Sequence, residues 1–264
     1  RGSHIVVPKL YDHDKCYFFQ GTDGRIIFSI PYEYDFTLIG TTDADHDDIE
    51  TKPNCSDAER DYLVKFASQY FAKEIFPKDV VWSYSGVRPL YDDGTANASA
   101  ATRDYVLKLE HSEGSAPLLN IFGGKITTYR KLAEAAIAEV ASFFPQLKEP
   151  WTANSSLPGG DFAVEDVAKL IEKLRADFSF LSEIRAKRLI RAYGLNAWEL
   201  LKGAAKLEDL GEQFGEILTK REVEYLRKNE FAIEAEDIIW RRTKLGLKMS
   251  EQDIKRLSEY LKTS

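Results

Sequence analysis

The stretch Leu118–Arg130 places the strongest constraint on how this chain can fold. An apolar run leads into the pair Gly123 and Gly124, and apolar residues then recur at helical spacing from Ile126 to Val140. This order is typical of a buried strand, a tight turn and a helix. The sequence therefore predicts a strand-turn-helix unit at this position.

The predicted turn has the chemistry of a site for an electron-rich, partly anionic group. Glycine has no Cβ, so the backbone can come close to a bound group. The first turn of a helix presents N–H groups and a partial positive charge, and Lys125 adds a full charge. The candidate contacts are Gly123, Gly124, Lys125, Ile126, Thr127 and Thr128. The alternative is an ordinary turn in which glycine is needed only for its dihedral angles.

Composition and charge exclude several classes of protein. The chain has 264 residues and a net charge of -7, whereas a general nucleic-acid binder needs a basic face. No apolar run reaches the roughly 18–20 residues of a membrane-spanning helix. The acidic run Asp43–Asp48 lacks the glycine and the terminal glutamate of a calcium loop, so we expect no metal. We expect Cys16 and Cys55 to be reduced.

Two kinds of periodicity divide the chain. In the first part, alternating patterns predict antiparallel strands at 4–8, 16–19, 25–30, 36–42, 80–90 and 103–109. A helix is expected to begin at Ser56. Beyond Pro158 the spacing is helical throughout, with helices expected at 163–177, 182–193, 196–202, 219–230, 234–245 and 250–262. The predicted fold class is α+β, an antiparallel sheet and a strand-turn-helix followed by an all-α C-terminal domain. The predicted boundaries are 1–117, 118–150 and 151–264.

Cationic side chains near strand ends are candidates for binding phosphate. Arg88 lies between Val87 and Pro89 in an apolar segment, where a charge without an anion would be costly. The same argument applies more weakly to Arg103. Two guanidinium groups and the Lys125 ammonium suit a phosphate dianion, because arginine matches phosphate oxygens bidentately. The alternative for each arginine is an ordinary surface ion pair.

Several motifs follow one another in a defined order along the chain. In the first part they are Gly2–Pro8, Ile39–Asp43, Tyr84–Leu90, Thr102–Tyr105 and Phe122–Glu134. In the helical part they are Leu157–Gly160, Asp209–Gly215 and Trp240–Gly246. Together these motifs resemble those of the bacterial, respiratory, FAD-dependent glycerol-3-phosphate dehydrogenases. The resemblance covers essentially the whole chain. It implies that the family's N-terminal glycine-rich FAD segment lies outside these residues, so that this chain alone is expected to be inactive.

The resemblance also implies a reaction and its partners. The family oxidises sn-glycerol 3-phosphate to dihydroxyacetone phosphate, with FAD as cofactor and a membrane quinone as electron acceptor. It is peripheral on the inner face of the cytoplasmic membrane, and a homodimer is compatible with the sequence. A glycerol-3-phosphate oxidase using oxygen, or a non-catalytic structural fragment, are the alternatives.

The resemblance also implies roles for individual residues. His4 and Arg88 are the expected catalytic residues. Histidine has an ordinary pKa of about 6.5, so His4 is the better base, although both stay candidates. Arg88, Arg103 and Lys125 are expected to bind the substrate. The turn from Gly123 to Thr128 is expected to stabilise the flavin as it becomes anionic.

Overall fold

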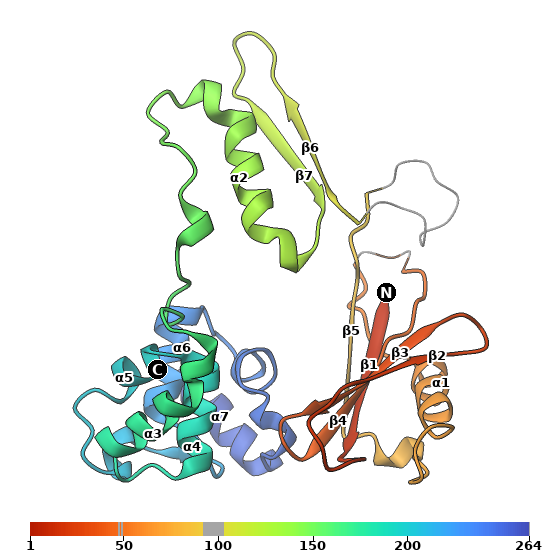
Figure 1. Cartoon of the computed structure of the whole chain (residues 1–264), viewed down its shortest axis with the longest axis vertical. Coiled ribbons are helices and arrows are strands. Elements are labelled where there is room, and N and C mark those ends of the chain that lie inside the picture. Colours follow the sequence, from red (N-terminus) through yellow and green to blue (C-terminus); the bar gives the residue numbers. More distant parts are fainter. Residues whose placement is uncertain (47, 49, 92–102, 264) are drawn as a thin grey trace. The chain divides into compact units, whose positions relative to one another are not determined.

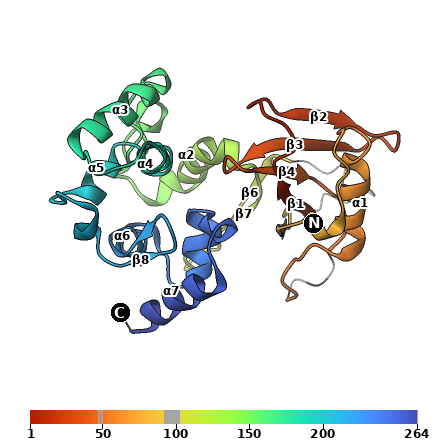
Figure 2. The same ribbon diagram turned by 90° about the horizontal axis from the view of Figure 1, so that it is seen from below.

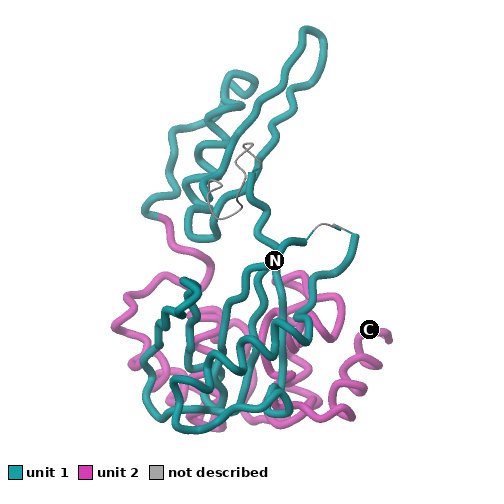
Figure 3. Tube along the Cα trace, turned by 90° about the vertical axis from the view of Figure 1, so that its right-hand side faces the viewer, with its two compact units in different colours: residues 1–154 teal, residues 155–264 magenta. Residues whose placement is uncertain are grey.

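The computed structural model describes residues 1–46, 48, 50–91 and 103–263 (Figure 1). Asp47 of the acidic run and Thr102 of one family motif lie outside these residues. The chain divides into two compact units, Arg1–Asn154 and Ser155–Ser264 (Figure 3). In the described ranges, no helix has both the length and the apolar character needed to cross a bilayer.

A five-stranded antiparallel sheet organises the first unit, in the order β2-β3-β4-β1-β5. Its strands are β1 (Gly2–Pro8), β2 (Tyr17–Gln20), β3 (Ile26–Tyr32), β4 (Phe36–Gly40) and β5 (Trp82–Gly86). The predicted antiparallel pairing is confirmed; β2, β3 and β4 follow one another in chain order, whereas β1 lies between β4 and β5. This central position fits its sequence, because Ile5, Val6 and Val7 are fully buried.

Helix α1 (Asp57–Ala67) packs against one face of the sheet (Figure 2). As predicted, the helix begins after Ser56, which forms a capping box with Glu59. The Glu59 N–H donates to Ser56 Oγ at 3.3 Å, and the Ser56 N–H donates to the Glu59 carboxylate at 3.0 Å. Its apolar face joins the inner residues of the strands in one cluster, which includes Leu63, Val64, Phe66, Ile5, Val7, Ile27 and Ile39.

The predicted strand-turn-helix is present in the first unit. Strand β7 (Leu118–Gly123) pairs with β6 (Tyr105–Glu110). A 3-10 turn over Ile126–Thr128 then leads into α2 (Tyr129–Val140), which packs on this hairpin. The expectation of a buried strand is wrong here, since Leu118, Ile121 and Phe122 are exposed. In the described residues β7 pairs with β6 alone, and its pleated surface is only partly covered.

The second unit is built mainly from helices around one apolar core. The α-helices are α3 (Val167–Asp177), α4 (Glu183–Tyr193), α5 (Asn196–Leu201), α6 (Lys220–Glu230) and α7 (Glu251–Thr263). These five follow the predicted ranges closely. The predicted helix at 234–245 is instead a π-helix, Asp237–Arg242, followed by a 3-10 turn, Leu245–Leu247.

The prediction that this unit is entirely helical is wrong. Two short strands, β8 (Gln213–Phe214) and β9 (Leu218–Thr219), pair antiparallel within it. Phe214 and Leu218 are almost fully buried. Arg185 holds the connecting turn by donating to the Ile217 carbonyl at 3.0 Å and to the Glu216 carbonyl. The burial of two apolar side chains and these side-chain bonds favour an extended pair over a helical turn.

Candidate active site

His4 lies near the start of β1, between two flanking strands. Gly40 of β4 is its partner on one side and Tyr84 of β5 is its partner on the other. The imidazole stacks on the Tyr84 ring, with centroids 5.0 Å apart and planes 4° apart. A Cβ added to Gly40 would lie 2.1 Å from His4 Cδ2. Position 40 therefore requires glycine, because the imidazole of His4 occupies the space that any Cβ there would need.

The surroundings of His4 favour a neutral imidazole. Burial lowers the pKa of His4 below its ordinary value of 6.5, and the positive charge of Arg88 lowers it further. Nδ1 is buried and has no hydrogen-bond partner among the described residues. A neutral imidazole keeps a lone pair that can accept a proton, so His4 has the protonation state that a general base needs at neutral pH.

Arg88 lies just beyond the end of β5, close to the start of β1. Its Nη2 would lie 3.1 Å from a Cβ added to Gly2, and its charge acts on His4. Its side chain is 42% exposed, and its ion pair with Asp43 is long, 3.6 Å from Nη1 to Oδ1. Asp43 supplies the anion that the sequence argument required for this charge, but the expected burial is wrong, because Val87, Arg88 and Pro89 are exposed. The sheet nevertheless brings Arg88 and His4 together.

The two predicted glycines adopt the left-handed backbone region, with φ of +69° at Gly123 and +95° at Gly124. A Cβ on Gly123 would lie 3.2 Å from the Asp104 carbonyl oxygen and 3.5 Å from that of Pro89. The close backbone approach at Gly123 is therefore made by the chain itself. It also places Pro89, the neighbour of Arg88, beside the end of β7.

The other predicted binding residues lie around this turn. The Lys125 ammonium is 3.8 Å from Asp104 Oδ1, and its side chain is 49% exposed. Arg103 is exposed immediately before β6. At the helix start, Ile126 is 86% exposed and Thr127 is exposed, while Thr128 Oγ1 donates to the Lys125 carbonyl at 3.1 Å. The start of the helix thus presents a cation, a hydroxyl and an apolar side chain to its surroundings.

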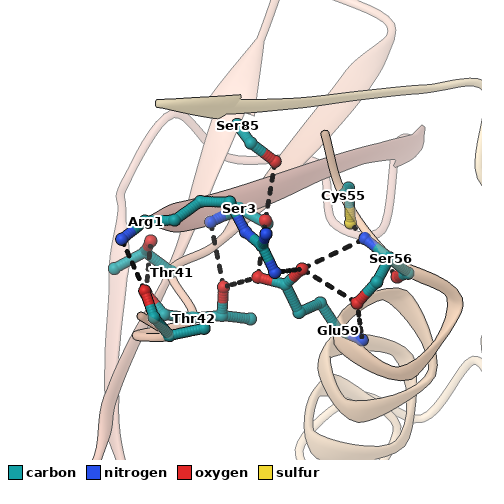
Figure 4. Close-up of polar contacts among 9 residues, drawn as sticks. Arg1, Ser3, Thr41, Thr42, Cys55, Ser56, Glu59 and Ser85 are labelled. Carbon is teal, nitrogen blue, oxygen red and sulfur yellow. Dashed lines mark hydrogen bonds and ion pairs between the residues drawn. The ribbon is translucent and has the colours of Figure 1, made fainter. Parts of the chain in front are cut away.

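Sequence reasoning missed the polar network beneath His4. Glu59 was not among the predicted site residues, yet its carboxylate binds Ser3 and Thr42 as well as the helix cap (Figure 4). Tyr84 was also missed as a partner of His4. Its place in the Tyr84–Leu90 motif was a signal, but the pairing of β1 with β5 was needed to use it.

Comparison with known proteins gives matches along nearly the whole chain. Residues 1–130 match the family described as FAD dependent oxidoreductase. Residues 150–262 match the C-terminal domain of alpha-glycerophosphate oxidase. A solved structure, glycerol-3-phosphate dehydrogenase from Bacillus halodurans complexed with FAD, is similar with a TM-score of 0.73 and 25% identity, over 99% of this chain and 55% of that one.

Curated relatives agree with these matches. The chain is 45% identical to glycerol-3-phosphate dehydrogenase of Pseudomonas aeruginosa over 100% of its own length and 51% of the relative. It is 40% identical to aerobic glycerol-3-phosphate dehydrogenase of Escherichia coli, over 99% of the chain and 52% of the relative. It is 42% identical to D-erythritol 1-phosphate dehydrogenase of Brucella abortus, over 96% and 50%. The chain spans about half the length of these relatives. It belongs to the FAD-dependent oxidoreductase family that contains the glycerol-3-phosphate dehydrogenases.

Proposed function

We propose that this chain is part of a flavin-dependent enzyme that oxidises sn-glycerol 3-phosphate to dihydroxyacetone phosphate. The observation that carries the proposal is that a neutral His4 lies within the electrostatic influence of Arg88, whose guanidinium is beside Gly2 at the start of β1. In this proposal residues 1–117 form mainly the substrate side, residues 118–150 belong to the FAD domain, and residues 151–264 form the C-terminal helical domain. The names of the relatives support the substrate and the cofactor.

The chemistry divides between a proton and a hydride. Oxidation of a secondary alcohol removes a proton from oxygen and a hydride from carbon. A bound flavin supplies the acceptor for the hydride. His4, held neutral by its surroundings, takes the hydroxyl proton. Arg88 donates hydrogen bonds to the same oxygen and stabilises the negative charge that grows there. Arginine has a pKa above about 12, so it is the poorer candidate for the base.

Arg103 and Lys125, with Arg88, would hold the phosphate. The protein's own partner for Lys125 is Asp104, at 3.8 Å, and that carboxylate is 81% exposed. An ion pair this open contributes only about 0–1 kcal/mol, so a phosphate dianion would compete well with it. Arg88 has a similarly long and exposed partner in Asp43. These cations therefore have binding capacity left for a ligand.

The turn from Gly123 to Thr128 fits the electron-rich edge of a flavin. The helix start carries a partial positive charge and N–H donors, and Lys125 lies at its cap position. The residues that would hold the ring are Gly123, Gly124, Lys125, Ile126, Thr127 and Thr128. The exposed side chain of Ile126 suits contact with a flat aromatic group. These residues would stabilise negative charge on the bound ring by the dipole and the ammonium.

The electron acceptor in this proposal is a membrane quinone, reached by an enzyme that is peripheral on the inner face of the cytoplasmic membrane. A specific observation favours a second candidate. The match of residues 150–262 is to the C-terminal domain of an oxidase, which favours oxygen as the acceptor. The products separate the two, since a quinone is reduced to a quinol and oxygen is reduced to peroxide.

The test uses the complete protein with its flavin under anaerobic conditions. We expect sn-glycerol 3-phosphate to bleach the flavin absorbance, and unphosphorylated glycerol to leave it unchanged at the same concentration. D-erythritol 1-phosphate is the competing substrate, because a relative is named for it. Reoxidation by a quinone analogue or by oxygen then identifies the acceptor. A flavin-loaded protein that neither phosphate bleaches would contradict the proposal.

A further inference from the structure

Glu59 connects helix α1 to the end of the sheet at which β1 begins (Figure 4). The residue is only 8% exposed. Its Oε1 accepts from Ser3 Oγ at 2.8 Å and from Thr42 Oγ1 at 2.7 Å. Its Oε2 accepts from the Ser56 N–H at 3.0 Å and from Arg1 Nη2 at 2.9 Å. One oxygen thus binds the sheet, and the other binds mainly the helix cap.

The network reaches three segments of the sheet through Ser3. The Ser3 N–H donates to Thr42 Oγ1 at 2.9 Å, which ties β1 to the residues after β4. Ser3 Oγ lies 2.7 Å from Ser85 Oγ, which ties β1 to β5. His4 follows Ser3 in the chain, and Arg88 follows shortly after Ser85. The carboxylate of Glu59 therefore holds both strand ends from which the site residues extend.

Glu59 and the imidazole act from opposite faces of β1. Successive side chains of a strand point to opposite faces, so Ser3 faces α1 while His4 faces away from it. The imidazole has little room to shift sideways, because it lies directly over Gly40 and stacks on Tyr84. A movement of the end of β1 would therefore change where the imidazole meets its substrate and its neighbour Arg88.

We propose that Glu59 is a positioning residue for the active site, whose carboxylate fixes the ends of β1 and β5 so that His4 and Arg88 act on the same substrate oxygen. This inference rests on the proposed function and extends it to a residue that does not touch the substrate. Burial raises the pKa of Glu59, but hydrogen bonds from Ser56, Thr42 and Ser3 outweigh it and lower the pKa to about 2. The carboxylate therefore stays charged wherever the enzyme turns over.

A simpler role for Glu59 is that of a helix cap, and the structure separates the two roles. Thr42→Val removes a hydroxyl that binds Oε1 and leaves the cap contacts in place. Ser56→Ala weakens the cap, where Ser56 Oγ bonds the Glu59 N–H and Oε2, and leaves the sheet contacts in place. These two variants are matched, because each removes hydroxyl contacts to Glu59 from one side of the same network.

The experiment measures two properties in the complete protein carrying each variant. NMR titration of the His4 imidazole, assigned by its loss in His4→Gln, reports the position of the ring without any substrate. Steady-state kinetics with an artificial acceptor gives kcat and KM. We expect Thr42→Val to raise the His4 pKa toward 6.5, because a displaced ring is less buried. Glu59→Ala also removes a negative charge, which by itself lowers the His4 pKa, so this variant is judged by its kinetics. We expect kcat to fall by about 10–100-fold, since a small misplacement of a catalytic group has that cost, with KM changed far less.

Ser56→Ala should lower the melting temperature while the His4 pKa and kcat stay close to wild type. Equal effects of Ser56→Ala and Thr42→Val, or a Thr42→Val enzyme that matches wild type in both properties, would overturn the positioning role. If Glu59→Ala does not fold, the comparison of Thr42→Val with Ser56→Ala still tests the positioning role. A wild-type protein that oxidises no polyol phosphate would refute the proposed function. The His4 pKa in wild type and in the Thr42→Val and Ser56→Ala variants would then still test whether Glu59 positions the imidazole.

Discussion

The imidazole of His4 and the phenol ring of Tyr84 lie parallel, with centroids 5.0 Å apart and planes 4° apart. The two residues are partners across β1 and β5. The neighbouring strand therefore sets the plane of the imidazole.

This stacking gives a prediction for Tyr84. Tyr84→Phe keeps the stacked ring and should leave kcat within about threefold of wild type, whereas Tyr84→Ala should lower kcat by about tenfold. The tenfold figure for Tyr84→Ala corresponds to the upper part of a stacking contribution of about 0.5–1.5 kcal/mol. Steady-state kinetics of the complete protein with an artificial acceptor makes the comparison. Equal kcat values for the two variants would mean that the ring of Tyr84 does not position His4.

Gly40 offers a way to displace the imidazole without removing it. In Gly40→Ala the new Cβ would meet His4 Cδ2 at 2.1 Å, so the ring must move. A Cβ on Gly86, in the strand on the other side of β1, would have no atom of the described residues within 4 Å. We expect Gly40→Ala to lower kcat by about 10²-fold, the cost of a misplacement near 1 Å. Gly86→Ala should retain wild-type kcat, and a loss of the same size in both variants would disprove the steric argument.

Arg103 should act on binding more than on the chemical step. A phosphate that takes no part in the reaction is held about equally in the ground and transition states, so its loss raises KM more than it lowers kcat. Removing a charged hydrogen-bonding group costs about 1.5–3 kcal/mol, so Arg103→Ala should raise KM by about 10–100-fold. Arg25→Ala, another exposed arginine of the same unit, is the control. An Arg103→Ala enzyme with unchanged KM would remove Arg103 from the phosphate site.

The pH dependence of the enzyme follows from the environment of His4. Burial and then Arg88 hold the His4 pKa below 6.5, and a base must be unprotonated. The acid limb of kcat/KM should therefore lie below pH 6.5. In the unfolded chain His4 regains its ordinary pKa and binds a proton more readily, so folding stability falls as the pH drops below that value.

His4→Gln isolates this contribution to stability. Urea unfolding at about pH 7.5 and about pH 5.5, above and below the ordinary pKa of histidine, compares the two proteins. Wild type should lose more stability than His4→Gln between these conditions. If the free energies of unfolding of the two proteins differ by the same amount at both pH values, the imidazole has an ordinary pKa.

Local chemistry explains why much of the fold was predictable. The capping residue Ser56 and the glycine pair at 123–124 act within a few residues of themselves, so the helix start and the turn were visible in the sequence. The strands of the sheet followed from alternation. The place of β1 between β4 and β5 did not, because it depends on pairing with residues far along the chain. Pairing partners are not encoded in the periodicity of a single strand.

The features that the sequence did not predict depend on how distant parts of the chain pack in space. The β8–β9 pair is too short for alternation to be read, and its turn is held by Arg185 from a distant helix. The exposure of Arg88 was missed because an apolar neighbourhood in sequence is not a buried one in space. Arg103, Lys125 and the division of the first 150 residues into two parts stay predictions.

The rate of flavin bleaching in a single anaerobic turnover tests the central claim most directly. The complete protein is mixed with saturating sn-glycerol 3-phosphate, as wild type, His4→Ala and Arg88→Ala. Loss of a general base typically costs about 10²–10⁴-fold, so His4→Ala should bleach more slowly by that factor while the concentration for half-saturation changes little. Arg88→Ala should slow the rate and weaken saturation together. A His4→Ala enzyme that bleaches at nearly the wild-type rate, beside an Arg88→Ala enzyme that does not bleach, would contradict the assignment of His4 as the base.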